Sequence, residues 1–93
     1  MPKLEWKALA IADLLEIVDY ISDNDPNAAQ ALKDEIEAKT SRIPENPQLY
    51  RVGRVVGTRE MVVRRHYIVI YSEDAITVTI LRVLHTARRW PEI

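Results

Sequence analysis

The side chains best suited to chemistry gather in the second half of the chain, where eight arginines and both histidines stand among apolar segments. Arginine presents a planar fork of donors that suits phosphate and carboxylate groups, and histidine can act as a general acid or base near neutral pH. They are densest in RVLHTARRWP, residues 82–91, where branched apolar residues give way to three arginines, a histidine and a tryptophan. This stretch is either a basic binding surface or the solvated end of a buried strand.

Charge is distributed unevenly along the 93 residues, although the net charge is only −1. Residues 1–50 hold five basic and ten acidic side chains, whereas residues 51–93 hold eight arginines, no lysine and four acidic side chains. Such a basic half can bind a polyanion or an acidic partner. Alternatively, the arginines flank strands and keep the sheet edges soluble. The sequence leaves both interpretations open.

Several classes of site are excluded by composition and spacing. The chain has no cysteine, so disulfides, thiol nucleophiles and cysteine metal sites are absent, as is common in a reducing cytoplasm. Gly53 and Gly57 are not followed by the residues of a phosphate-binding loop, and His66 and His85 lack partners at metal-ligand spacing. We therefore expect a cytoplasmic protein with no cofactor, no metal and no membrane segment.

The first half reads as a short strand followed by two helices. Residues 3–7 alternate apolar and charged, which predicts a strand. From residue 8, apolar residues recur at helical spacing, and we expect the acidic residues of this helix to face solvent. Asp25 can cap a second helix with Pro26 in its first position, and that helix should end before Pro44. Together, the two predicted helices should form an antiparallel hairpin.

The second half reads as a sheet. Alternation in residues 58–64, the β-branched and aromatic run 67–71, and the long apolar stretch 75–85 predict three strands, the last inside the sheet. Val52 and its neighbours allow a short extended piece before them. The predicted fold is α+β with the order β-α-α-β-β-β, a mainly antiparallel sheet with the hairpin on one face, forming one domain over residues 1–93.

Arginines and aromatic residues accompany this sheet, and they support two interpretations. On an open sheet face they can hold RNA by phosphate pairing and base stacking. Otherwise Tyr67 and Tyr71, four residues apart on one face, pack in the core. Trp90, beyond the last strand, is expected to plug the edge of the sheet rather than stack on bases. The residues concerned are Arg59, Arg64, Arg65, Arg82, Arg88, Arg89, Tyr50, Tyr67, Tyr71 and Trp90.

The whole chain resembles the RelE/ParE superfamily of bacterial toxins, closest to the ParE branch. The resemblance covers the layout and the phrases ALAIADLLEIVDYI, ENPQLYRVGR, VGTREMVVRRHYIVIY and ILRVLHTARRWP, of which the last is the most specific. It implies a small cytoplasmic toxin of a type II toxin–antitoxin module, neutralised in a hetero-oligomeric complex by a cognate antitoxin.

Two activities occur in this superfamily. RelE-type toxins cut messenger RNA on the ribosome, whereas ParE-type toxins poison DNA gyrase and carry no hydrolytic chemistry. In RelE-like nucleases an arginine follows the first tyrosine of the strand equivalent to HYIVIY, and here that position is Ile68. Isoleucine cannot stabilise charge in a phosphoryl transition state. The resemblance therefore favours a gyrase inhibitor over a ribosome-dependent endoribonuclease, with a non-toxic antitoxin-binding module as a third reading.

The resemblance assigns roles to particular residues. The expected contacts with gyrase or its DNA are Arg59, Arg82, His85, Arg88, Arg89 and Trp90. The expected antitoxin contacts are Arg59, Arg65, Arg82 and Tyr71, because an acidic antitoxin segment can neutralise basic toxin residues. In the nuclease alternative, the candidate catalytic residues are His85, Arg65 and Arg82.

Overall fold

The computed structural model describes residues 2–87 and 90–91, and its elements follow the predicted order with two additions. The predicted elements appear as β1 (Lys3–Trp6), α1 (Ala8–Ser22), α2 (Pro26–Ser41), β3 (Arg59–Val63), β4 (Tyr67–Glu73) and β5 (Thr77–His85). The additions are a short 3-10 helix, η1 (Ile43–Glu45), and a two-residue strand, β2 (Arg51–Val52), which is the extended piece allowed by the sequence.

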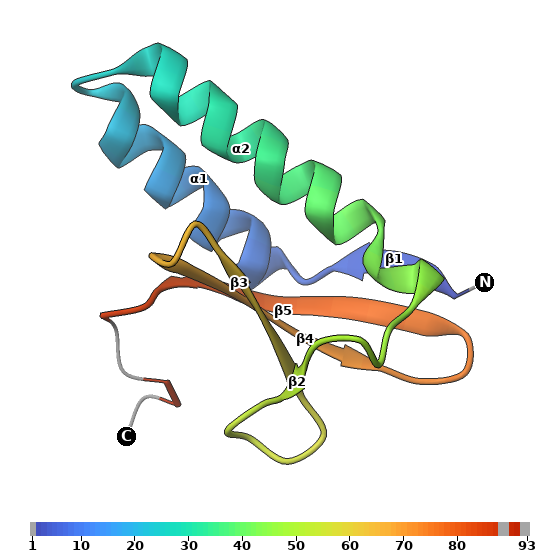
Figure 1. Cartoon of the computed structure of the whole chain (residues 1–93). Helices are drawn as coiled ribbons and strands as arrows, with labels where there is room; N and C mark the ends of the chain where they lie inside the picture. The colour runs from blue at the N-terminus through green and yellow to red at the C-terminus, as the bar shows by residue number, and fades with distance from the viewer. Residues whose placement is uncertain (1, 88–89, 92–93) are drawn as a thin grey trace.

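The helical hairpin forms where the sequence predicts it. Asp25 caps α2, because its Oδ1 accepts the Ala28 N–H at 3.1 Å, and Pro26 takes the first helical position. Figure 1 shows both helices on one face of the sheet, where Leu14 of α1 and Ile36 of α2 are buried. Neither helix in the described part of the chain is long and apolar enough to cross a lipid bilayer.

The five strands form one sheet in the order β1-β5-β4-β3-β2, in which β1 runs parallel to β5 and the other pairs are antiparallel. The prediction of an internal last strand is confirmed, since β5 lies between β1 and β4. However, β1 covers only the first half of β5. Its pairing ends at Trp6 opposite Ile80, where the chain turns into α1. The remaining edge of β5, residues 81–85, is therefore left for side chains of α1 to cover.

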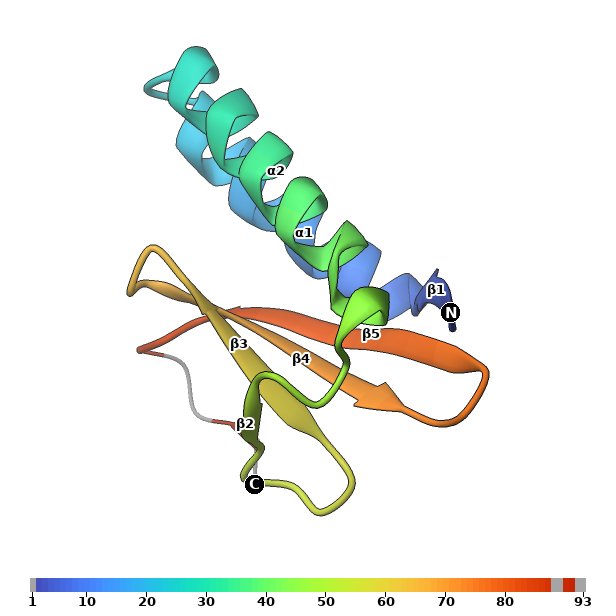
Figure 2. The same cartoon turned by 45° about the vertical axis from the view of Figure 1, so that its right-hand side comes forward.

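The two faces of the sheet carry different contents. The face under the helices is the main core, and it holds Tyr71, Val69 and Ile80 among other buried residues. The opposite face, called the open face below, carries a smaller apolar cluster of Ile68, Ile70 and Leu84, against which Leu81 and Trp90 pack. Figure 2 shows that the β2–β3 loop lies away from the helical hairpin.

Candidate functional site

Asp13 of α1 holds the guanidinium of Arg82 at the uncovered edge of β5. Arg82 Nε donates to Asp13 Oδ2 at 2.7 Å and Nη2 donates to Oδ1 at 3.1 Å, while the Val83 N–H also reaches Oδ2 at 3.1 Å. The two side chains are only 13% and 7% exposed. The expectation that the acidic residues of α1 face solvent is therefore wrong for Asp13, because the edge of β5 beyond β1 offers donors that draw it inward.

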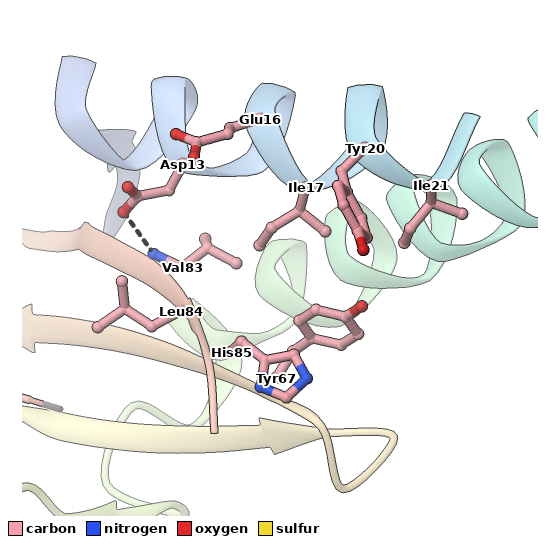
Figure 3. Close-up of a pocket in the computed structure, with 9 residues that line it drawn as sticks. All are labelled: Asp13, Glu16, Ile17, Tyr20, Ile21, Tyr67, Val83, Leu84 and His85. Atoms are coloured by element: carbon pink, nitrogen blue, oxygen red, sulfur yellow. Dashed lines mark hydrogen bonds between the residues drawn. The ribbon is translucent and has the colours of Figure 1, made fainter. Parts of the chain in front are cut away.

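Beside this ion pair, α1 and the end of β5 enclose a cavity of about 370 Å³, drawn in Figure 3. His85 and Tyr67 stand at its lower side in the figure and Tyr20 faces them from α1. No arginine or lysine lines it among the described residues. The lining residues are Asp13, Glu16, Ile17, Tyr20, Ile21, Tyr67, Val83, Leu84 and His85.

His85 is held by aromatic neighbours and by the turn that follows it. Its ring lies 5.5 Å from the Tyr67 ring, edge to face, and 6.0 Å from the stacked His66 ring. Its Nδ1 accepts the Ala87 N–H at 3.0 Å, so the neutral imidazole carries its proton on Nε2. The two histidines meet because β4 pairs with β5, which sets Tyr67, next to His66, opposite His85. Their spacing in the sequence does not indicate this contact. This imidazole is a candidate proton donor or acceptor, but the described residues that line the cavity include no arginine or lysine to hold a phosphate.

Ile68 is buried on the open face, at the position where the resemblance places an arginine in nucleases. Its side chain is 4% exposed and packs with Ile70, Leu84 and Trp90. Trp90 thus packs on the sheet, but on its open face rather than over the predicted edge. Arg82 Cζ lies 5.8 Å from the centre of the Trp90 ring, within cation–π range. The indole Nε1 is buried and has no acceptor among the described residues. Apolar packing, rather than a charged site, occupies this part of the open face.

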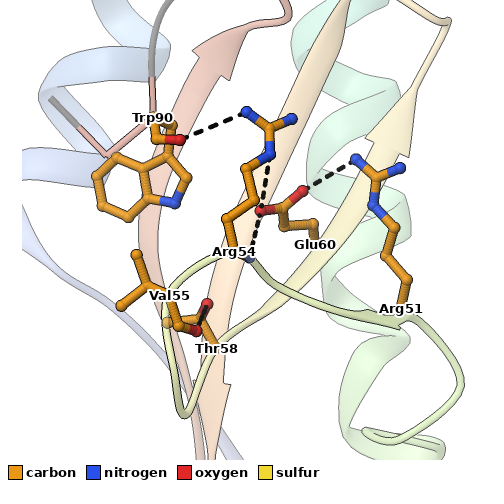
Figure 4. A network of polar contacts seen from close by, with 6 residues as sticks. All are labelled: Arg51, Arg54, Val55, Thr58, Glu60 and Trp90. Atoms are coloured by element: carbon orange, nitrogen blue, oxygen red, sulfur yellow. Dashed lines mark hydrogen bonds and ion pairs between the residues drawn. The ribbon is translucent and has the colours of Figure 1, made fainter.

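A buried carboxylate on β3 organises two arginines that the sequence reasoning did not single out, as Figure 4 shows. The Glu60 side chain is 1% exposed, and its Oε1 accepts Arg51 Nη2 at 2.9 Å. Its Oε2 accepts the Arg54 N–H at 3.1 Å and lies 3.7 Å from Arg54 Nε. Arg54 Nη1 also reaches the Trp90 carbonyl at 3.4 Å, which links the β2–β3 loop to the C-terminal segment.

Two of the predicted contact residues serve the fold. Arg59 Nη1 donates to the Tyr50 carbonyl at 2.8 Å, and its Nε lies 3.7 Å from a Glu73 carboxylate oxygen. Tyr71 is fully buried, and its hydroxyl donates to the Pro47 carbonyl at 2.6 Å. Burial raises the pKa of Tyr71 to about 12. Contacts of Arg59 with a target and of Tyr71 with an antitoxin stay predictions.

The β3–β4 turn carries two arginines in left-handed backbone conformations. Arg64 has φ 53° and Arg65 has φ 66°, which costs side chains other than glycine roughly 1–2 kcal/mol each. Arg64 Nε donates to Glu35 of α2 at 2.7 Å, and this bond, with help from Lys39, holds the pKa of the Glu35 carboxyl below its ordinary value. Arg65 is exposed. Arg88 and Arg89 lie outside the described residues, so their predicted contacts stay predictions.

The arrangement of helices and strands is that of a RelE/ParE-type α+β protein, as solved structures confirm. A chain of the chromosomal ParDE toxin–antitoxin system from P. aeruginosa matches with a TM-score of 0.80 and 25% identity, covering 91% of this chain and 96% of that one. A chain of the E. coli DinJ–YafQ complex matches with a TM-score of 0.63 and 13% identity, covering 94% and 96%, which is a likeness of fold.

Sequence comparisons identify the family. The model of the ParE toxin of the type II toxin–antitoxin system parDE matches residues 4–90. The putative toxin Y4kP of Sinorhizobium fredii is 32% identical over 91 residues, covering 98% of this chain and 95% of the relative. The toxin RelE2 of Caulobacter vibrioides is 33% identical over 88 residues, covering 95% and 99%. The chain belongs to the ParE family of type II toxins.

Proposed function

We propose that this toxin acts by inhibiting DNA gyrase and is neutralised by a cognate antitoxin. The observation that carries the first part is the apolar open face around Ile68. Cutting RNA at a phosphate needs preorganised donors where negative charge develops, and a buried isoleucine beneath Trp90 supplies none. The likeness at 25% identity to a chain of a ParDE system supports the same choice.

The arginines of the nuclease alternative give further support to this choice. Arg82 is engaged by Asp13, so recruiting it to a phosphate requires the exchange of one anionic partner for another. Arg65 is exposed in the β3–β4 turn and is not among the residues that line the cavity, which come from α1, β4 and the end of β5. Among the described residues, no arginine or lysine lines the cavity beside His85.

The second part of the proposal concerns the antitoxin, and the cavity beside α1 is the surface that suits it. Ile17 and Ile21 offer apolar contacts there, and the tyrosines add aromatic ones. Relatives of this fold come from a ParDE toxin–antitoxin system and from the DinJ–YafQ complex, which supports a protein partner. The exposed Arg65 remains a candidate contact for an acidic antitoxin segment.

The test compares two activities of the purified chain. Gyrase and relaxed plasmid are incubated with increasing toxin, and supercoiling and cleaved DNA are measured; in parallel, messenger RNA cleavage is followed on programmed ribosomes. The proposal expects lost supercoiling with cleaved plasmid, and intact messenger RNA. Codon-dependent RNA cuts with unaffected gyrase would overturn it, and would make His85, Arg65 and Arg82 the residues to test as nuclease groups.

A further inference from the structure

The β2–β3 loop and strand β2 display apolar and basic side chains together in solvent. Val56 is 98% exposed and Val52 is 71% exposed, and the Arg51 and Arg54 side chains are 55% and 49% exposed. Residues 51–56 thus place two valines among two arginines at the surface; they are called the valine–arginine loop below. Isolated apolar residues on a surface are ordinary, but two of them framed by arginines resemble the composition of a protein interface.

Hydrogen bonds between the loop and Thr58 order the valine–arginine loop. The Gly53 N–H donates to the Thr58 carbonyl at 2.7 Å, and the Thr58 hydroxyl donates to the Val55 carbonyl at 2.6 Å. Gly57 has φ +85°, and a Cβ at Gly53 would lie 2.3 Å from Thr58 Oγ1. The only two glycines of the chain are therefore required here. A preordered loop loses little conformational entropy on binding, which favours affinity.

Glu60 orients the two arginines, although burial of its carboxylate costs free energy. A carboxylate that is 1% exposed is expensive to bury, and an apolar residue beside Ile70 would avoid this cost. What the carboxylate adds is orientation, because one of its oxygens holds Arg51 and the other holds Arg54. Each guanidinium keeps further donors in solvent. Glu60 is thus a positioning residue for a pair of half-exposed arginines.

We propose that the valine–arginine loop is the element that binds the target protein, with its valines in an apolar depression and its arginines on carboxylates at the rim. This inference rests on the proposed function, under which the target is gyrase. A protein suits the loop better than nucleic acid does. The exposed valines gain nothing from a phosphate backbone, whereas an apolar depression on a protein would bury them.

The location of the loop separates it from the cavity proposed for the antitoxin. The cavity lies between α1 and the end of β5, whereas the loop lies below the sheet in Figures 1 and 2, on the side away from the helices. Arg54 joins the loop to the Trp90 carbonyl, so Trp90 borders the same surface. Substitution of the loop's exposed valines should therefore weaken binding of the target without affecting the fold.

The main test is Val56→Asp, with Ile76→Asp as its matched control. Val56 and Ile76 are both exposed apolar residues of hairpin turns, and Ile76 is 72% exposed in the turn between β4 and β5. Both variants should melt within about 2 °C of the wild type, because neither side chain packs in the core. We expect Val56→Asp to raise the toxin concentration that half-inhibits supercoiling at least about tenfold, as for a central interface residue, and Ile76→Asp to change it less than about twofold.

Glu60→Gln tests the positioning role. Glutamine keeps the shape of the side chain but removes the charge that holds both guanidiniums, so inhibition of gyrase should weaken. In a protein that already carries Arg51→Ala and Arg54→Ala, the same change should leave inhibition unaltered, because no arginine remains to be positioned. An equal loss of inhibition in both backgrounds would assign Glu60 a purely structural role and would overturn this step.

The outcomes separate the loop from the proposed function. If the wild type inhibits gyrase and Val56→Asp inhibits it equally well, the loop inference fails and the gyrase proposal stands. If the wild type leaves gyrase unaffected, the gyrase proposal fails, and growth of cells expressing each variant becomes the readout. Relief of toxicity by Val56→Asp alone would then keep the loop as the binding element for another protein; undiminished toxicity, or a harmless wild type, would overturn it. Loop-dependent binding of labelled plasmid DNA without gyrase would also overturn it.

Discussion

Replacing Asp13 with alanine should strongly destabilise the fold. The substitution removes the acceptor of three hydrogen bonds, two from Arg82 and one from the Val83 N–H. Breaking a buried pair by removing one partner typically costs ~3–5 kcal/mol, because the other charge stays buried. Arg82 is 13% exposed, which relieves a small part of this cost. We therefore expect a loss of about 3 kcal/mol, a large share of the stability of a domain of this size.

Urea unfolding at neutral pH, followed by circular dichroism, measures this loss. Asp13→Ala, Arg82→Met and the double variant form a cycle, and the double variant should be more stable than the sum of the single changes implies, by about 1.5–3 kcal/mol. Glu16→Ala, on the solvent side of the same helix, is the control and should change stability by less than about 0.5 kcal/mol. A cost below about 1 kcal/mol for Asp13→Ala, or additivity in the cycle, would refute the buried pair and would mean that solvent screens these charges.

Three further predictions concern other parts of the structure. The folded-state pKa of Tyr71 is raised to about 12 from 10.0, so its contribution to stability is complete below pH 10 and is lost as the pH rises through 12. Tyr71→Phe should remove this alkaline loss, on the order of 3 kcal/mol, in pH-dependent urea titrations, whereas a loss unchanged in the variant would assign it to other groups. Arg65→Gly should raise the free energy of unfolding by about 1 kcal/mol because glycine accepts φ 66° without strain, and a decrease would show that the arginine side chain supports the turn. Trp90→Ala should lower the free energy of unfolding by about 2 kcal/mol through exposure of the cluster around Ile68, and a change below about 0.5 kcal/mol would exclude packing of the indole on that cluster.

The elements of the fold were predictable because they depend on local patterns. Leu14, Ile17 and Ile21 recur at helical spacing, and Asp25 and Pro26 mark the start of α2. Alternation and β-branched runs predict the strands. The β-bulge between Ile70 and Tyr71 could not be read, since nothing in either strand alone fixes the register of both.

The polar groups that shape the candidate sites were not predictable, since their partners are distant in sequence. Asp13 looks like an ordinary solvent-facing acidic residue of a helix. It pairs with Arg82 because β1 ends opposite Ile80 and leaves the rest of that edge of β5 open to side chains of α1. Glu60 sits in an alternating strand where an outward carboxylate is ordinary. One signal was available: Arg82 interrupts a strand that is apolar on both faces, and a buried guanidinium requires an anionic partner.

The side chains on the open face of the sheet are a better guide to the activity of a protein with this fold than the fold itself is. Chains sharing 13% identity keep the same helices and strands, so architecture alone cannot carry an activity. In this chain Ile68 and Trp90 fill the open face with apolar contacts, while the charged donors lie at its margin, on Arg51 and Arg54. Over the described residues, this part of the open face therefore offers apolar contacts rather than donors for a phosphate. Inserting arginine at position 68 alone should therefore not create a nuclease, because Trp90 would still cover that position.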